Sequence, residues 1–295
     1  MAGNWEGIEE AVAVANAGSF AGAAAILKVS TSHVSKVIAR LEHRLAAQLF
    51  NRTTRRVELT DTGRTFIDQS RRLIEERDEL LMMLHGAAQP QGALRVTCSI
   101  ALGERFVAAI VRRFSLAHPQ LQVTVDLTNR LVDIVAEGYD LAIRTGKVAD
   151  HRLVGRQIGI RRIETCASPH YLSVAGSPHA LADLDAHACL VGSTPTWRFG
   201  QGDGATSFTP KARWRCNSGS VIVEAALAGM GICQVPLFYV QDHLAAGRLT
   251  RVLPALAPPP EPIWAVYPGR RHLGPKVSGL VDLLERQLQP LLDGP

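Results

Sequence analysis

The stretch that most constrains the fold of this chain is residues 30–45, which have the pattern of one amphipathic helix. The apolar residues that recur there every three or four positions are Val34, Ile38, Leu41 and Leu45. A helix places these four in one buried stripe. Ser30 can cap the first turn, and the polar residues after it then lie where the helix dipole favours a phosphate. Such a helix either covers a core, as many surface helices do, or reads DNA.

Two shorter helices are predicted before this stretch and a hairpin after it. Residues 8–17 form the first, and Ser19 can cap a second over the alanine-rich residues 20–27. Residues 49–59 have the pattern of a two-stranded hairpin with its tip at residues 51–56. Three helices with a short turn between the last two, followed by a hairpin, are typical of a winged helix-turn-helix that binds DNA.

Positive charge is concentrated in this region. Residues 28–56 hold seven Lys and Arg residues and one acid, Glu42, whereas the whole chain has a net charge of +5. A basic patch of this kind is the electrostatic footprint of a nucleic-acid contact, although a solvated basic turn is the alternative for the hairpin tip. The residues expected to contact DNA are Ser19, Thr31, Ser32, His33, Ser35, Lys36, Arg40, Arg52, Arg55 and Arg56.

Residues 61–88 are predicted to form one long helix. Apolar residues repeat along it at an interval of seven, in the sets Phe66, Leu73, Leu80 and Ile67, Ile74, Leu81. A sustained seven-residue repeat is typical of a coiled-coil seam, and two DNA half-sites require a twofold partner. We therefore expect a dimer through this helix, with packing on its own domain as the alternative. Residues 89–92, Gln-Pro-Gln-Gly, end the helix and mark a domain boundary.

The remaining sequence alternates between strand and helix patterns. The first run is strand 94–98, helix 105–117, strand 121–127, helix 131–137 and strand 139–144. This alternation predicts an α/β fold with a parallel sheet covered by helices. A second run follows between residues 163 and 246, and strand 264–267 and helix 275–288 close the chain. We therefore expect two α/β lobes between which the chain crosses twice.

Residues 4–65 resemble the winged helix-turn-helix of LysR-type transcriptional regulators. The residues that carry the resemblance are Gly18-Ser19-Phe20, Ala24-Ala25, Val29-Ser30, Val34-Ser35-Lys36, Ile38, Leu41-Glu42, Leu49-Phe50-Asn51-Arg52, Leu59-Thr60 and Gly63. The later sequence resembles the same family in Gly92-Ala93-Leu94-Arg95-Val96, Gly138-Tyr139-Asp140-Leu141-Ala142-Ile143-Arg144, Cys166-Ala167-Ser168-Pro169, Gly229-Met230-Gly231-Ile232 and Gly247-Arg248-Leu249. The resemblance covers essentially the whole chain.

Two departures from the family pattern limit what the resemblance implies. Family members usually carry Gly where Ala46 stands, so the helix before it is expected to run on or to end differently. They commonly carry Gln-Pro-Ala or similar where Thr31, Ser32 and His33 stand, so operator preference does not transfer.

The resemblance implies a DNA-binding domain, a linker and dimerisation helix, and a regulatory domain like a periplasmic binding protein, with two lobes hinged around an effector cleft. The implied boundaries are residues 1–60, 61–89 and 90–295, with lobe I at about 90–163 and 266–295 and lobe II at about 164–265. It also implies a pseudo-palindromic DNA operator, a homodimer that often pairs into a tetramer, and RNA polymerase as a candidate partner.

A two-lobed α/β domain binds ligands where loops leave the carboxyl ends of its strands. The residues at these positions are Ser99, Ile100, Ala101, Thr128, Asn129, Arg144, Thr145, Gly146, Ser193, Thr194, Asn217 and Ser218. Hydroxyls and helix amides suit a carboxylate, so a small organic or aromatic acid is the expected effector. Loop capping is the alternative role for each residue. Arg144 is the sharpest test because a buried arginine needs an anionic partner.

Several classes of function lack their sequence motifs. The chain has no Cys-x-x-Cys, no His-Glu-x-x-His and no Gly-x-x-x-x-Gly-Lys loop, so we expect no metal, no cofactor and no enzyme. It has no apolar run long enough to span a bilayer and no signal-peptide pattern near Met1. We therefore expect a cytoplasmic protein with reduced thiols and no membrane contact.

Two alternatives stay open. The first is a cytosolic small-molecule binding protein or enzyme on the α/β domain, which would lack the steep salt dependence of DNA binding. The second is a thiol-based redox regulator of the same fold, which needs an accessible thiol of low pKa with a partner nearby. The cysteines are widely scattered, which disfavours this alternative: Cys98, Cys166, Cys189, Cys216 and Cys233.

Overall fold

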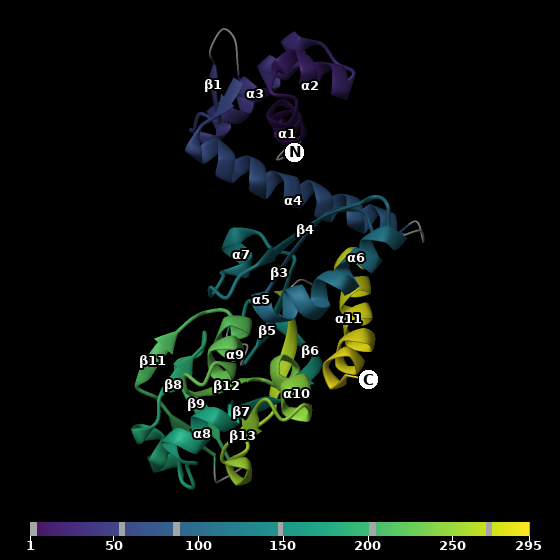
Figure 1. The fold of residues 1–295 in the computed structure, drawn as a ribbon. Helices are drawn as coiled ribbons and strands as arrows, with labels where there is room; N and C mark the ends of the chain where they lie inside the picture. Colours follow the sequence, from purple (N-terminus) through teal and green to yellow (C-terminus); the bar gives the residue numbers. More distant parts are fainter. Residues whose placement is uncertain are drawn as a thin grey trace. The chain divides into compact units, whose positions relative to one another are not determined.

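Figure 1 shows the computed structural model, which describes residues 5–52, 57–84, 89–146, 150–200, 205–269 and 273–294. By its internal contacts the chain divides into two units, Met1–Ala88 and Gln89–Pro295. The long helix that follows the predicted hairpin therefore belongs to the first unit, and the predicted α/β region forms the second.

The first unit begins with three helices, α1 (Ile8–Ala17), α2 (Phe20–Leu27) and α3 (Thr31–Leu45). Both predicted caps are present, because Ser19 Oγ accepts a hydrogen bond from Gly22 N at 3.0 Å and Ser30 Oγ accepts one from His33 N at 3.1 Å. The residues that α3 buries are Val34, Val37, Ile38 and Leu41. The helices thus pack around one apolar core.

The predicted stripe of α3 was wrong at its last position. Leu45 is 40% exposed, because it is the final residue of the helix, and Val37 is buried instead. The helix ends at Ala46, which takes the left-handed conformation (φ 47°) and donates its N–H to the carbonyls of Glu42 and His43. Alanine therefore closes this helix as glycine would, at some cost in backbone strain.

The hairpin after α3 consists of β1 (Phe50–Arg52) and β2 (Val57–Leu59), which pair antiparallel. Of the predicted tip, residues 51–56, the structure places Asn51 and Arg52 in β1, and residues 53–56 lie outside the described residues. Glu42 Oε1 of α3 accepts hydrogen bonds from Leu49 N at 2.8 Å and Phe50 N at 3.1 Å. One carboxylate thus fixes the first strand of the wing against α3.

Helix α4 (Asp61–Leu84) follows the hairpin. A Cβ at Gly63 would lie 2.0 Å from the Leu49 carbonyl oxygen, so only glycine fits where α4 passes the hairpin. Of the seven-residue repeat, Ile67 is fully buried in the core of this unit, whereas Leu73 is 46% exposed. The first turns of α4 therefore pack on their own domain, and an apolar side chain farther along remains exposed.

Lobe I of the second unit is a mixed sheet in the order β4-β3-β5-β14-β6. Its strands are β3 (Gly92–Cys98), β4 (Leu121–Leu127), β5 (Leu141–Thr145), β6 (Leu153–Arg161) and β14 (Glu261–Pro268). β3, β4 and β5 run parallel, and β14 runs antiparallel to β5 and β6. The predicted parallel arrangement of the first three strands is therefore confirmed, and the returning strand β14 adds an antiparallel part to the sheet.

One helical run and one late helix cover a face of this sheet. The run is continuous through α5 (Ile100–Leu102), the π-helical turn η1 (Gly103–Val107) and α6 (Ala108–Ala117), so it begins five residues before the prediction. α11 (Pro275–Asp293) packs beside α6 and on β6 (Figure 1). The short α7 (Ile134–Glu137) contributes to a separate apolar cluster that includes Ala142 of β5.

The alternation of side chains along β3 and β5 positions the polar residues of lobe I. Leu141 and Ile143 of β5 join the main core, and Ala142 between them joins the cluster of α7. Arg144 is two residues after Ala142, so its side chain leaves the sheet on the same side. Thr97, which likewise alternates with core residues of β3, is fully buried and faces it.

Lobe II is also a mixed sheet, in the order β11-β8-β12-β7-β13. Its strands are β7 (Ile163–Ala167), β8 (Cys189–Val191), β11 (Ala212–Arg215), β12 (Ile232–Pro236) and β13 (Thr250–Arg251). The elements beside the sheet are α8 (Pro169–Ala175), η2 (Leu181–Ala186), the hairpin of β9 (Trp197–Phe199) and β10 (Thr206–Phe208), α9 (Gly219–Leu227), α10 (Leu237–Ala245) and η4 (Pro254–Leu256). Separate apolar clusters hold them on the two faces.

The chain crosses between the lobes twice, as predicted. The first crossing runs from β6 to β7 through Arg162, and the second leads from β13 to β14. Residues 261–265, which the sequence placed in lobe II, belong to the sheet of lobe I, because Glu261 pairs with Arg161 at the start of β14. Strand β6 itself was not predicted, since Gly155 and Gly159 interrupt its apolar alternation.

No single helix in the described parts of the chain is long and apolar enough to span a membrane. α1 and α2 meet that test only as a pair, and they are bent by 119° where they join.

Candidate functional site

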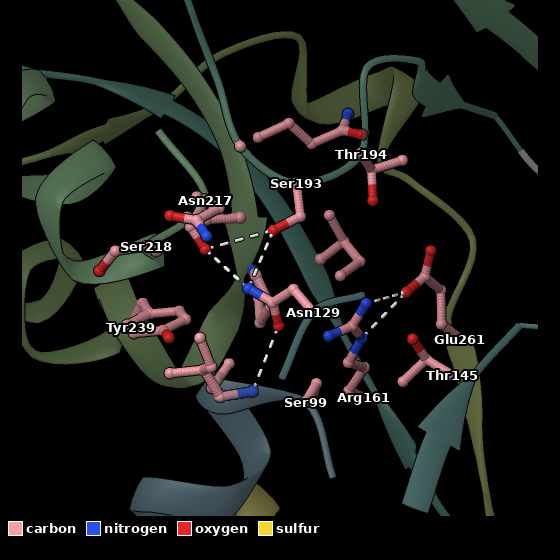
Figure 2. Close-up of a pocket in the computed structure, with 18 of the residues that line it drawn as sticks. Ser99, Asn129, Thr145, Arg161, Ser193, Thr194, Asn217, Ser218, Tyr239 and Glu261 are labelled. Carbon is pink, nitrogen blue, oxygen red and sulfur yellow. Dashed lines mark hydrogen bonds and ion pairs between the residues drawn. The ribbon is translucent and has the colours of Figure 1, made fainter. Parts of the chain in front are cut away.

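A cavity of about 390 Å³ lies between the two lobes of the second unit (Figure 2). Its walls come mainly from loops that leave the carboxyl ends of the strands. Ten of the twelve residues predicted from strand ends line it: Ser99, Ile100, Ala101, Asn129, Arg144, Thr145, Ser193, Thr194, Asn217 and Ser218. The structure thus brings together residues that are up to 119 positions apart in the sequence.

Thr128 and Gly146 do not line the cavity. The Thr128 carbonyl accepts a hydrogen bond from Arg144 Nη1 at 2.9 Å, and its hydroxyl accepts one from Arg130 N at 3.1 Å. Thr128 therefore stands behind the wall and positions Arg144. Gly146 is exposed and has a φ of +96°, so it turns the chain away after β5.

Arg144 supplies unpaired positive charge to the cavity. Its Nη1 donates to the Thr128 carbonyl and its Nη2 to Thr97 Oγ1 at 2.8 Å, and both acceptors are neutral. Among the described residues no carboxylate forms an ion pair with it. Burial lowers the pKa of the Arg144 guanidinium below its ordinary value, but an arginine stays cationic at neutral pH. A partly buried cation fixed by neutral groups favours an anionic ligand.

The side chain of Ser99 and the backbone amide of Ile100, both in lobe I, lie at the start of the helical run Ile100–Ala117. Ser99 Oγ is buried and has no hydrogen-bond partner within the described residues. The N–H of Ile100 donates to Asn129 Oδ1 at 3.2 Å. The first amide of a helix carries partial positive charge, so this end of the cavity favours a carboxylate oxygen.

Asn129 connects the two lobes. Its Nδ2 donates to the Asn217 carbonyl at 2.8 Å and to Ser193 Oγ at 3.2 Å, both in lobe II (Figure 2). Ser193 Oγ in turn donates to the Asn217 carbonyl at 3.2 Å. A side chain that follows β4 of lobe I is thus part of a hydrogen-bonded group across the cavity.

Several residues of the cavity were missed by the sequence reasoning. Arg161 Nη2 and Glu261 Oε2 form an ion pair at 2.7 Å beside the crossings (Figure 2). Leu131, which is 94% exposed, and Tyr239 also line the cavity, as does the almost fully buried Trp197. Burial raises the pKa of the Tyr239 hydroxyl, so it stays a neutral donor. Of these residues, only Leu131 could have been found from the sequence, because it is an apolar residue next to a predicted loop. The positions of the others depend on contacts between segments that are far apart in the sequence.

The cysteines do not form an accessible redox centre. Cys98, Cys166, Cys189 and Cys233 are fully buried. Burial raises the pKa of Cys98 to about 12 and that of Cys189 to about 11. Cys166 and Cys233, which the sequence separates widely, pair across β7 and β12 with their Sγ atoms 3.6 Å apart. The hydrogen bond from Cys166, together with burial, raises the pKa of Cys233. The raised pKa values keep the thiols of Cys98, Cys189 and Cys233 protonated, which disfavours thiol sensing.

The described part of the chain contains no cluster of three or more His, Cys, Asp or Glu residues that could hold a metal ion.

The predicted DNA contacts fall into three groups in the first unit. Thr31, Ser32, His33 and Lys36 are exposed on α3, and Ser35 is half-buried. Ser19 caps α2, as described. Arg55 and Arg56 lie outside the described residues, as does the side chain of Arg52.

Arg40 is already engaged by an acid. Its Nη2 forms an ion pair with Glu6 Oε1 at 2.5 Å, and Arg44 donates to the Glu6 carbonyl. Glu10 lies 4.0 Å from His33 Nε2 on the same flank of α3. Glu6, which precedes α1, thus restrains Arg40, a cation that the sequence left free for DNA.

Comparisons with known proteins agree with this architecture. The model of the bacterial regulatory helix-turn-helix protein, lysR family, matches residues 5–64, and that of the LysR substrate binding domain matches residues 87–289. The HTH-type transcriptional regulator DmlR of Escherichia coli (strain K12) is 34% identical over 279 residues, which cover 92% of this chain and 91% of DmlR. The transcriptional activator AaeR of the same strain is 32% identical and covers 90% of this chain and 88% of its own.

Solved structures show the same fold. CrgA, a LysR-type transcriptional regulator from Neisseria meningitidis, matches with a TM-score of 0.58 and 28% identity over 96% of this chain and 99% of its own. Full-length AphB, the Vibrio cholerae virulence activator, matches in fold with a TM-score of 0.59 and 24% identity over 94% and 97%. The predicted fold class is thereby confirmed. The chain belongs to the family of LysR-type transcriptional regulators, with a helix-turn-helix domain followed by a substrate-binding domain.

Proposed function

We propose that the cavity between the lobes binds a small organic or aromatic carboxylate and that this effector controls DNA binding by the first unit. The observation that carries the proposal is Arg144, a half-buried cation held by two neutral acceptors at the cavity wall. The Ser99 hydroxyl, which has no hydrogen-bond partner of ordinary geometry among the described residues, would add a further donor for the same anion. An anion bound here would supply the charged partner that Arg144 lacks and would accept a hydrogen bond from Ser99.

The rest of the cavity supports an acid with an apolar body. Leu131 exposes nearly its whole side chain at the wall, and Trp197 and Tyr239 line the same space. Arg161 is neutralised by Glu261, so it adds less positive charge than Arg144. One carboxylate at Arg144 and an uncharged remainder against the apolar wall therefore fit the lining best.

In the first unit we propose that Thr31, Ser32, His33, Ser35 and Lys36 of α3 contact base edges and phosphates of a pseudo-palindromic operator. The exposed polar start of α3 supports this, since recognition helices present their N-terminal residues to the major groove. The backbone contacts assigned to Ser19, Arg52, Arg55 and Arg56 belong to the same proposal and would add affinity more than sequence choice.

Assembly and location follow from operator binding. We propose a homodimer through α4, paired further into a tetramer, because the exposed Leu73 continues a seven-residue repeat. A regulator that binds chromosomal operators acts in the cytoplasm, so we propose that location. AaeR is named an activator, and activation acts on RNA polymerase, so we propose RNA polymerase as a further partner.

Thermal unfolding of the full chain against a panel of aliphatic and aromatic carboxylates tests the effector proposal. A ligand at one hundred times its Kd adds roughly 2.7 kcal/mol to the free energy of unfolding. We expect Arg144→Ala to abolish that shift, and Arg213→Ala, which removes an exposed arginine outside the cavity, to preserve it. No shift with any carboxylate, or a shift that survives Arg144→Ala, would contradict the proposal.

A further inference from the structure

The carboxamide of Asn129 is bonded to both lobes at the polar end of the cavity. Its Oδ1 accepts from Ile100 N in lobe I, and its Nδ2 donates to Ser193 Oγ and to the Asn217 carbonyl in lobe II (Figure 2). Both N–H groups of the carboxamide and its oxygen thus take part in hydrogen bonds. A single side chain thus joins the two lobes at the point where Ser99 and Ile100 begin the helical run.

The oxygen of this carboxamide lies where an anion would bind. The N–H of Ile100 is the first amide of a helical run through Ala117, and an amide in that position prefers a carboxylate oxygen. A carboxylate forms a hydrogen bond roughly twice as strong as that of a neutral amide oxygen. A carboxylate that reaches Ile100 N would therefore displace Asn129 Oδ1.

We propose that Asn129 is an internal latch: it holds lobe I to lobe II and competes with an effector carboxylate for the amide of Ile100. The inference rests on the proposed function and adds how occupancy of the cavity is transmitted. When the carboxylate takes Ile100 N–H, the carboxamide loses its anchor in lobe I, and its two bonds to lobe II no longer fix the lobes in their present arrangement. Binding at one lobe thereby changes the restraint on the other.

The latch can be removed without dismantling lobe II. Ser193 Oγ and the Asn217 carbonyl are bonded to each other, so these two loops stay connected in an Asn129→Ala variant. Asn217→Ala is a matched control, because it removes an asparagine side chain from the same cavity and keeps the carbonyl that Asn129 uses. Asn129→Ser is a second test that keeps a small polar side chain too short to bridge the lobes.

The first measurement follows amide hydrogen exchange of the full-length protein without added ligand. Asn129→Ala and Asn129→Ser should increase exchange at Ile100 and in the loops around Ser193 and Asn217. Asn217→Ala should leave the exchange of Ile100 at the wild-type rate. Equal exchange at Ile100 in all four proteins would overturn the latch, since its amide would then not depend on Asn129.

The second measurement is calorimetric titration of the same proteins with benzoate and with succinate. Competition predicts that Asn129→Ala binds the better of these anions on the order of tenfold more tightly, which corresponds to about 1.4 kcal/mol. Weaker or unchanged binding by Asn129→Ala would overturn the competition and make Asn129 either an ordinary ligand contact or a bystander.

Arg144→Ala separates failure of the latch from failure of the effector proposal. If wild type binds an anion and Arg144→Ala does not, the anion site stands, whatever Asn129 does. If neither benzoate nor succinate binds to wild type or to Asn129→Ala, where the Ile100 amide is free, both the carboxylate class and the competition are overturned.

Discussion

Whether an individual arginine is paired with an acid says more about its role than the net charge of the whole chain does. In the second unit, Arg161 pairs with Glu261 and Arg130 pairs with Glu137, whereas Arg144 is held only by neutral oxygen atoms. In the first unit, Arg40 pairs with Glu6 and Arg77 pairs with Glu9. The neutral surroundings of Arg144 therefore support the proposed anion site, and the ion pair of Arg40 engages one of the cations expected to contact DNA.

Glu6→Gln should strengthen non-specific DNA binding. The Glu6–Arg40 pair is exposed, with side chains 48% and 60% accessible, so its loss costs stability little. The released Arg40 can neutralise one more phosphate, which steepens the slope of log affinity against log salt by about 0.9. Fluorescence anisotropy on a random duplex at several salt concentrations measures this slope.

Glu9→Gln is the matched control for this prediction, because it removes the same charge three residues farther along the chain but frees Arg77 of α4 instead. If both variants change the slope equally, the effect comes from net charge, and the restraint of Arg40 by Glu6 has no role in DNA binding.

Cys216 should be the thiol that alkylating reagents reach first. It is partly exposed, whereas the other four cysteines are fully buried. Iodoacetamide at pH 8 should therefore label about one thiol in the native protein, and Cys216→Ser should remove that label. Rapid loss of the Cys166 and Cys233 thiols on treatment with peroxide would instead revive the redox alternative, since their Sγ atoms are 3.6 Å apart.

At the scale of elements, the end of α3 stores strain that a substitution can release. Ala46 has a φ of +47°, in the left-handed region that costs a residue with a Cβ about 1 kcal/mol. We expect Ala46→Gly to raise the free energy of unfolding of the first unit by roughly that amount. Urea denaturation followed by circular dichroism measures the change.

Ala47→Gly provides the control for strain at the helix end. Ala47 is not among the described residues with positive φ, so glycine there only adds flexibility to the unfolded chain and should lower stability. Stabilisation by both substitutions, or by neither, would show that the conformation of Ala46 is not what limits this helix end.

Local signals explain which elements the sequence could predict. The caps at Ser19 and Ser30, the 3.6-residue periodicity of α3 and the domain boundary near Gln89 depend on neighbouring residues, and the structure contains each of them. β6 escaped prediction because Gly155 and Gly159 interrupt its apolar alternation and because its partner strand β14 lies one hundred or more positions away. The Arg161–Glu261 pair was invisible for the same reason.

For the cavity, the sequence indicated most of the predicted lining residues but not the contacts between the two lobes. Strand ends indicated ten of its lining residues, because parallel strands deliver their following loops to one edge of a sheet. The bridge of Asn129 to Ser193 and Asn217 could not be predicted, since it depends on how closely the lobes approach. The family resemblance gave the domain order. The sequence singled out Arg144, and the structure adds that its hydrogen-bond partners are neutral.

For the whole molecule, the exposed part of α4 bears on assembly. Leu73 is 46% exposed in a helix whose Ile67 is buried in its own unit. If α4 forms the dimer, Leu73→Glu should shift the full chain from dimer to monomer in analytical ultracentrifugation and weaken binding to a two-half-site duplex. Arg64→Glu, on an exposed face of the same helix, should leave the dimer intact. A dimer that persists in Leu73→Glu would exclude this residue from the interface.

The position of β14 also has a consequence for biosynthesis. β14 lies between β5 and β6 in lobe I, and α11 supplies much of the core beneath it, yet both are translated after all of lobe II. On the ribosome, lobe II can therefore close before lobe I, although the first strands of lobe I emerge earlier. Until residues 261–293 leave the exit tunnel, β5 and β6 have no strand between them. A nascent chain thus acquires its cavity last, and translation halted before Glu261 yields a product without one.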